Sequence, residues 1–143
     1  IQLTLSQQVP LTGAVVVTTP QDIALIDAKK GLRMFQKVNV PILGIIENMS
    51  VFICPHCGEV EHIFGEGGAK RMSEQYGVPL LGELPLSAKI REQADSGLPT
   101  VAAEPDGKEA LMYREMAMKV AGALARITKD YTAKMPGIRV VND

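Results

Sequence analysis

The chain has 143 residues, of which 46% are hydrophobic and 22% are charged, a composition typical of one globular domain. Its formal net charge of −1 gives no indication of a basic surface for nucleic acid or for an anionic membrane. No apolar run reaches the roughly 20 residues that a membrane-spanning helix requires, and no secretory signal is visible. We therefore expect a cytoplasmic protein with neither a nucleic-acid nor a membrane partner.

Three short apolar runs bounded by turn residues predict buried strands over residues 14–18, 42–47 and 80–84. They are rich in Val, Ile and Leu without clean polar alternation, which is typical of parallel strands covered on both faces. The chain begins with Ile1 and contains only three such strands, whereas sheets usually have roughly 4–6. We therefore expect further N-terminal strands of the same sheet to be missing from this sequence.

Helical periodicity predicts a helix over residues 20–38, between the first two strands, with Thr19 as its N-cap. Its apolar stripe would face the sheet and contains Leu25, Ala28, Leu32 and Phe35. Further helices are predicted over residues 69–76, 86–94 and 108–129, with a loop over 97–107. The last helix is expected to bury Met112, Met116, Val120, Ala123, Leu124 and Ile127. Alternating strands and helices indicate an α/β fold with a doubly wound, mostly parallel sheet and helices on both faces.

The two cysteines share the tetrapeptide Cys-Pro-His-Cys at residues 54–57, inside a segment predicted to be irregular, residues 49–68. Two residues separate Cys54 from Cys57, so both thiolates can turn toward one metal, and the intervening turn aims backbone N–H groups at their sulfur atoms. Gly58 can take the positive φ that such a turn often requires. With no sign of secretion, metal or redox chemistry is a better expectation than a structural disulfide.

A pair of thiolates is half of a site, since structural zinc and a [4Fe–4S] cluster each usually take four ligands. His62 would raise the count to three, whereas a two-fold dimer with one cysteine pair from each chain reaches four, which favours a bridging metal or cluster. Structural zinc and a redox dithiol stay open as alternatives. The dithiol is disfavoured because no helix is predicted to begin at the motif and because acidic neighbours oppose a thiolate, namely Glu59, Glu61 and Glu66.

Several segments occur in a distinctive order: Val-Val-Val-Thr-Thr-Pro-Gln-Asp (15–22), Gly-Ile-Ile-Glu-Asn-Met-Ser (44–50), Cys-Pro-His-Cys-Gly (54–58), Ile-Phe-Gly-x-Gly-Gly (63–68) and Gly-Glu-Leu-Pro-Leu (82–86). They resemble the Mrp/ApbC-type iron–sulfur cluster carriers, which are MinD/ParA-like P-loop ATPases. The resemblance extends over about residues 3–125. It implies that residues 1–130 are the C-terminal part of a single P-loop ATPase domain, followed by a tail, residues 131–143.

The resemblance further implies a homodimer that binds a [4Fe–4S] cluster through Cys54 and Cys57 of each chain and transfers it to apo iron–sulfur proteins. Zinc is a possible substitute at the same thiolates. ATP and magnesium are implied for the intact protein, with Asn48 recognising adenine through its side-chain amide and Pro85 bordering the base. An alternative for Asn48 is a polar residue that ends a strand and bonds to nearby backbone.

The phosphate-binding loop of that family, Gly-x-x-x-x-Gly-Lys-Ser/Thr, does not occur in the sequence. The carboxylates that would help to hold magnesium precede Ile1 in the family pattern. We therefore assign no catalytic residue, and we expect that this chain alone does not hydrolyse ATP.

Overall fold

The computed structural model describes Thr4, Val9 and residues 11–127. Its centre is a parallel sheet with the strand order β1-β2-β5, formed by β1 (Ala14–Thr18), β2 (Ile42–Glu47) and β5 (Leu80–Glu83). The three predicted strands and their parallel arrangement are confirmed, although the third ends one residue earlier than predicted. The predicted tail, residues 131–143, lies outside the described residues.

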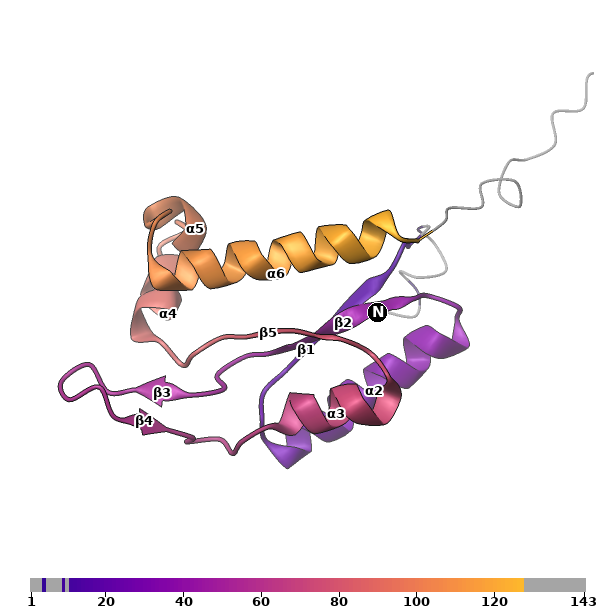
Figure 1. Cartoon of the computed structure of the whole chain (residues 1–143), viewed down its shortest axis with the longest axis horizontal. Coiled ribbons are helices and arrows are strands. Elements are labelled where there is room, and N and C mark those ends of the chain that lie inside the picture. The colour runs from indigo at the N-terminus through magenta and orange to yellow at the C-terminus, as the bar shows by residue number, and fades with distance from the viewer. Residues whose placement is uncertain (1–3, 5–8, 10, 128–143) are drawn as a thin grey trace, which may run out of the picture.

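Helices cover both faces of the sheet (Figure 1). α2 (Asp22–Lys37) and α3 (Gly68–Tyr76) pack on one face, and α6 (Lys108–Ala125) packs on the other. Two shorter helices, α4 (Ala88–Asp95) and α5 (Thr100–Ala103), connect β5 to α6. This is the predicted α/β arrangement. Among the described residues, no helix combines the length and apolarity needed to cross a membrane.

The core lies between the sheet and the helices α2 and α3. It consists of Val16, Leu25, Ala28, Leu32, Ile45, Ala69 and Met72. The predicted stripe of α2 is largely confirmed, because Leu32 has no exposed surface and Leu25 is only 6% exposed. Burying such an aliphatic side chain contributes about 1.5–3 kcal/mol relative to leaving it in water.

Two helices begin later than predicted. α2 begins at Asp22 with Gln21 as its N-cap, because the Thr19 hydroxyl donates to the Gln21 side chain (2.9 Å) instead of capping the helix. α4 begins at Ala88, where the Ser87 side chain accepts a hydrogen bond from the Ile90 N–H at 3.4 Å. The predicted loop over residues 97–107 contains the short helix α5.

α6 buries a narrower stripe than predicted. Met116 is 5% exposed, whereas Met112 is 39% and Leu124 is 36% exposed, so the prediction that these two residues are buried is wrong. Met116 can approach the sheet because Gly82 has no side chain: a Cβ at Gly82 would lie 2.5 Å from Met116 Cγ. The helix therefore rests on β5 through Met116, and its flank with Met118, which is 74% exposed, faces outward.

Candidate functional site

The two cysteines lie in the turn that joins the strands of a β-hairpin. This hairpin projects from the body of the molecule (Figure 1). Its strands, β3 (Phe52–Ile53) and β4 (Val60–Glu61), pair antiparallel. The hairpin follows β2 along the chain, so it extends beyond the carboxyl end of that strand. The prediction that residues 49–68 are irregular throughout is therefore wrong. The sequence did not reveal these strands because each has only two residues, too few to show an alternation of apolar and polar side chains.

Backbone hydrogen bonds close the cysteine loop. The Cys54 N–H donates to Glu59 O and the Gly58 N–H donates to Cys54 O, each at 2.9 Å. Gly58 has a φ of 76°, in the left-handed region that glycine adopts readily, as predicted. Cys54 is half-buried, Cys57 is exposed, and both are free thiols. One short loop therefore presents two accessible sulfur atoms.

The backbone of this loop lowers the pKa of the Cys54 thiol. The largest contributions are hydrogen bonds from the N–H groups of Cys57 and His56, and a hydrogen bond from the Cys57 side chain adds to them. Partial desolvation and the Glu61 carboxylate oppose this shift, but they are the smaller effects. The predicted influence of acidic neighbours on the thiolate is thus present for Glu61 and is outweighed by the backbone donors.

The donor set on one chain is a pair of thiolates. Within the part of the chain that the structure describes, no group of three or more His, Cys, Asp and Glu side chains is arranged to hold a metal ion. The His62 imidazole is instead placed with its Nε2 3.9 Å from Glu66 Oε1. Thiolates are soft ligands that suit zinc and iron–sulfur clusters. A four-ligand site would therefore need donors from a second molecule.

The outgoing leg of the hairpin is attached to the end of β5. Ser50 is buried, and its N–H and hydroxyl both donate to Leu84 O, at 2.9 Å and 3.1 Å. The Leu86 N–H donates to Val51 O at 2.7 Å, and Phe52 forms a parallel bridge with Leu86. An isolated two-stranded hairpin is marginally stable in water. These bonds anchor it to the sheet and so orient the cysteine loop.

Asn48 directly follows β2, and Pro85 lies two residues beyond β5. The Asn48 N–H donates to Thr18 O at 2.7 Å, and its side-chain Oδ1 accepts a hydrogen bond from the Met49 N–H at 3.0 Å. This local bond fits the alternative that Asn48 is a polar residue that ends a strand and bonds to nearby backbone. The bond uses Oδ1, so the NH₂ group of the side chain stays available to donate a hydrogen bond to a base. Both residues lie at the carboxyl edge of the parallel sheet, where α/β folds of this kind bind ligands.

A cavity of about 470 Å³ lies between the hairpin and the carboxyl edge of the sheet. Pro85 lines this cavity together with Glu47, Ser50 and His62, whereas Asn48 is not among its lining residues. The structure therefore brings Pro85 next to the base of the hairpin, but it does not place Asn48 and Pro85 in one cavity.

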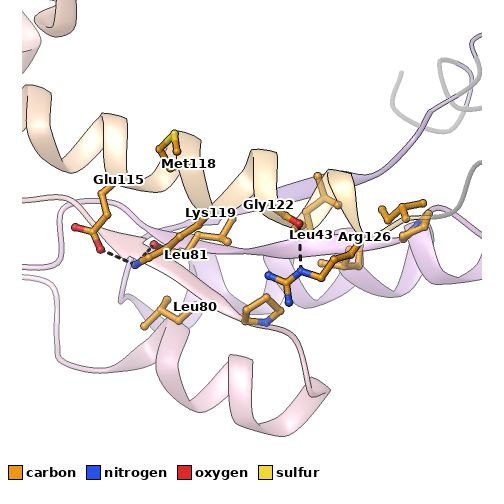
Figure 2. A pocket seen from close by; sticks show the side chains of 13 residues that line it. Leu43, Leu80, Leu81, Glu115, Met118, Lys119, Gly122 and Arg126 are labelled. Atoms are coloured by element: carbon orange, nitrogen blue, oxygen red, sulfur yellow. Dashed lines mark hydrogen bonds and ion pairs between the residues drawn. The ribbon is translucent and has the colours of Figure 1, made fainter.

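A second hollow, of about 630 Å³, lies at the opposite edge of the sheet, between the amino ends of β2 and β5 and the C-terminal half of α6 (Figure 2). Its lining is mainly apolar and includes Leu43 and Leu80. Lys119 lies at this hollow, paired with Glu115 at 2.8 Å and donating to Leu81 O at 3.0 Å. Since ligands of such sheets bind at the carboxyl ends of the strands, we place the functional site at the hairpin edge.

One residue of this edge was missed by the sequence reasoning. Glu47 ends β2 and is 1% exposed, and its Oε2 accepts a hydrogen bond from the Ala69 N–H at 2.6 Å. The available signal was an acidic residue that closes an otherwise apolar strand, because a buried carboxylate requires a hydrogen-bond partner. Its partner, 22 residues further along the chain, could not be read from the sequence.

Comparison with known proteins identifies relatives over most of the chain. Residues 1–121 match the ParA family, described as NUBPL iron-transfer P-loop NTPase. The chain is 58% identical over 118 residues to the iron–sulfur cluster carrier protein of Pseudomonas fragi, covering 82% of this chain and 41% of the relative. It is 59% identical over 124 residues to the protein of that name from Escherichia coli K12, covering 87% and 34%. The iron–sulfur cluster transfer protein NUBPL of Dictyostelium discoideum is 49% identical over 128 residues, covering 90% and 40%. The chain thus spans well under half the length of these curated relatives.

Solved structures share the fold. A nucleotide-binding protein from Archaeoglobus fulgidus, in complex with ADP, matches with a TM-score of 0.62 and 31% identity, covering 78% of this chain and 44% of that chain. The cell division ATPase MinD of Pyrococcus furiosus matches with a TM-score of 0.61 and 26% identity, covering 78% and 43%. These neighbours confirm the expected P-loop NTPase type of α/β fold. The chain belongs to the ParA family of NUBPL-type iron-transfer P-loop NTPases.

Proposed function

We propose that the protein carries an iron–sulfur cluster as its cargo and passes it to apo-proteins, with Cys54 and Cys57 as the ligands that this chain supplies. The observation that carries the proposal is the hairpin tip, where two accessible thiols lie side by side and backbone donors lower the pKa of Cys54. The identity of the cargo is supported by relatives at 58% and 59% identity that are named iron–sulfur cluster carrier proteins.

In this proposal the cluster, of the [4Fe–4S] type, bridges two copies of the chain. Two thiolates from each copy supply the four ligands that such a cluster usually takes, and two-fold pairing is the commonest symmetry of oligomers. Apolar surface lies beside the sulfur atoms, because Ile53, Val60 and Ile63 are each more than 50% exposed. A second copy would cover this surface. An exposed, shared site also suits cargo that is released by ligand exchange, whereas a structural zinc site is closed by four ligands.

ATP with magnesium acts in the whole protein, of which residues 1–130 are the C-terminal part of one ATPase domain. The NH₂ group of Asn48 recognises the adenine and Pro85 borders it. The position of both residues at the carboxyl edge of the sheet supports this assignment, as does the 31% identity to a nucleotide-binding protein solved with ADP. The chain supplies the adenine side of the site, since the phosphate-binding loop is not in its sequence.

The test is anaerobic reconstitution of the whole protein with iron and sulfide, followed by metal analysis and measurement of the dimer mass. We expect about four iron and four sulfide per dimer. Cys57→Ser removes half of the thiolates and should lose both the cluster and the cluster-bridged dimer, and Cys54→Ser should do the same. His62→Ala, which removes a potential ligand from the same segment, should keep both.

Three outcomes would contradict this proposal in different ways. Zinc at one per chain or one per dimer, without cluster uptake, would indicate a structural zinc site. Loss of loading in His62→Ala would indicate a site completed within one chain. A reversible disulfide between Cys54 and Cys57 at a physiological potential, without metal uptake, would indicate a redox dithiol.

A further inference from the structure

The start of α3 is held by a side chain from the sheet. The N-cap residue Gly67, with a φ of 65°, offers no side-chain hydrogen bond to the helix. Glu47, at the end of β2, supplies the acceptor instead, because its Oε2 bonds to the Ala69 N–H in the first turn. Helix N-termini have N–H groups without intrahelical partners, and an acidic group there is favoured by the helix dipole. Glu47 thus ties β2 to α3 through a bond shielded from water.

α3 is also the continuation of the return leg of the cysteine hairpin. A link of six residues, 62–67, separates β4 from α3, and it contains Gly65 with a φ of 98°. The first residue of the helix, Gly68, packs so closely that an added Cβ would lie 2.9 Å from Pro20 O. Because the link is short, the position of the start of α3 restricts where β4 and the cysteine loop can lie.

The residue next to Glu47 is Asn48, to which the proposed function assigns the adenine contact. Glu47 O accepts a hydrogen bond from the Leu84 N–H at 2.8 Å, and the Asn48 N–H donates to Thr18 O at 2.7 Å. The peptide unit between Glu47 and Asn48 is therefore held on both sides by hydrogen bonds. It is all that separates the Asn48 side chain, assigned to the nucleotide, from the Glu47 side chain, which holds the start of α3.

We infer that Glu47 couples nucleotide binding at Asn48 to the position of the cysteine hairpin, as a positioning residue that acts through α3. The inference rests on the proposed function for the role of Asn48. A nucleotide that shifts the end of β2 shifts Glu47, and with it the start of α3 and the return leg of the hairpin. The access of reagents to Cys54 and Cys57 changes as a result. Coupling between sites typically changes an affinity by about 5–150-fold.

The experiment measures the alkylation rate of the two cysteines in the cluster-free whole protein, with and without a non-hydrolysable ATP analogue. In the parent protein we expect the two rates to differ by about fivefold or more, the lower end of typical coupling. Glu47→Ala should bring the ratio close to one while the protein still binds the analogue. Glu47→Gln keeps an oxygen that can accept the Ala69 N–H and should restore most of the ratio. Glu83→Ala is the matched control, because Glu83 is the register partner of Glu47 on β5 and is exposed.

A parent ratio of one overturns the inference, and so does a Glu47→Ala protein that binds the analogue and keeps the parent ratio. Binding of the analogue by Glu47→Ala shows that this variant is folded, and rescue by Glu47→Gln assigns the effect to the acceptor of the Ala69 N–H. If Glu47→Ala does not fold, Glu47→Asp takes its place, since the shorter side chain moves the acceptor away from Ala69; an unchanged ratio in Glu47→Asp overturns the inference. Iron and sulfide uptake by the parent is scored separately, so failure of the proposed cargo is recognised independently of the thiol ratio.

Discussion

Cys54 lies one residue beyond β3, and the turn that follows presents the N–H groups of His56 and Cys57 to its sulfur atom. These donors belong to the backbone, so their placement depends on the conformation of the loop and not on the side chain of His56. Gly58, in the left-handed region, helps to fix that conformation. The chemistry of the site at the scale of single residues is therefore set by how the loop folds, and unfolding the loop should remove the effect.

The reactivity of Cys54 in the metal-free protein should follow from its lowered pKa. The thiolate is the nucleophile, so a lowered pKa means that the alkylation rate reaches its plateau at a lower pH than for an ordinary thiol. We expect the Cys57→Ser variant, in which Cys54 is the remaining thiol, to show a lower midpoint pH when folded than when unfolded in urea. The measurement is the alkylation rate against pH, in both states, with the same reagent.

Two variants test the physical cause of that shift. His56→Ala keeps the backbone N–H and should leave the midpoint of Cys54 almost unchanged. Gly58→Val strains the left-handed residue and should move the midpoint toward the unfolded value. Equal midpoints in the folded and unfolded protein would contradict the assignment of the shift to the backbone donors.

At the scale of elements, the sheet and its first helix could be predicted because their signals are local. Residues 14–18 and 42–47 are continuous apolar runs between turn residues, and both strands have these bounds. The stripe of Leu25, Ala28 and Leu32 follows the helical period and is buried. In such segments the spacing of apolar residues along the sequence is enough to predict both the type of element and the residues that it buries.

The features that were missed depend on contacts between distant segments. The strands of the cysteine hairpin are too short to show a period, and their base is held by Leu84 and Leu86 of the chain beyond β5. The buried face of α6 is selected by the missing side chain of Gly82, which lies 34 residues before Met116 in the sequence. For the candidate site, the Cys54–Cys57 pair was visible as a motif, whereas the contact of Glu47 with Ala69 was not.

The packing of α6 on β5 gives a prediction for stability. Gly82→Ala places a Cβ 2.5 Å from Met116 Cγ, and overpacking of this kind should destabilise the protein by about 1–3 kcal/mol. Met116→Ala alone should cost about 2–5 kcal/mol through the cavity that it leaves. The double variant should cost less than the sum of the two, because the shortened side chain makes room for the new methyl group. Urea unfolding of the four proteins gives the coupling.

Gly31 provides the opposite case for comparison. It lies inside α2, and an added Cβ would have no heavy atom within 4 Å apart from its chain neighbours and the adjacent backbone of the helix itself. Gly31→Ala should therefore stabilise the protein by about 0.5–1 kcal/mol, since glycine inside a helix loses more backbone freedom on folding than alanine.

Strict additivity in the Gly82 and Met116 cycle would show that these two residues do not set the position of α6.

At the scale of the whole molecule, the described sheet is open along β1. This strand pairs with β2 on one side, and within the described residues no strand lies on its other side. Val17 is 59% exposed, and a hollow of about 670 Å³ lies between β1 and α2. A strand edge of this kind is suited to pairing with another strand. This fits the proposal that residues 1–130 are part of a larger ATPase domain, whose curated relatives are more than twice as long as the matched region.

ATP hydrolysis should distinguish this chain from the whole protein proposed above. ATP hydrolysis in P-loop proteins requires the glycine-rich loop and its Lys, which cradle the phosphates and are not in this sequence. The 143-residue chain alone should therefore release no phosphate from ATP above the rate of a buffer blank, even though it carries the residues assigned to the adenine. The whole protein should hydrolyse ATP, and Asn48→Ala in that protein should weaken nucleotide binding, because the donor assigned to the base is lost. Saturable turnover by the isolated chain, abolished by Asn48→Ala, would instead mean that a phosphate-binding site exists within these 143 residues and that the division of roles between the two parts is wrong.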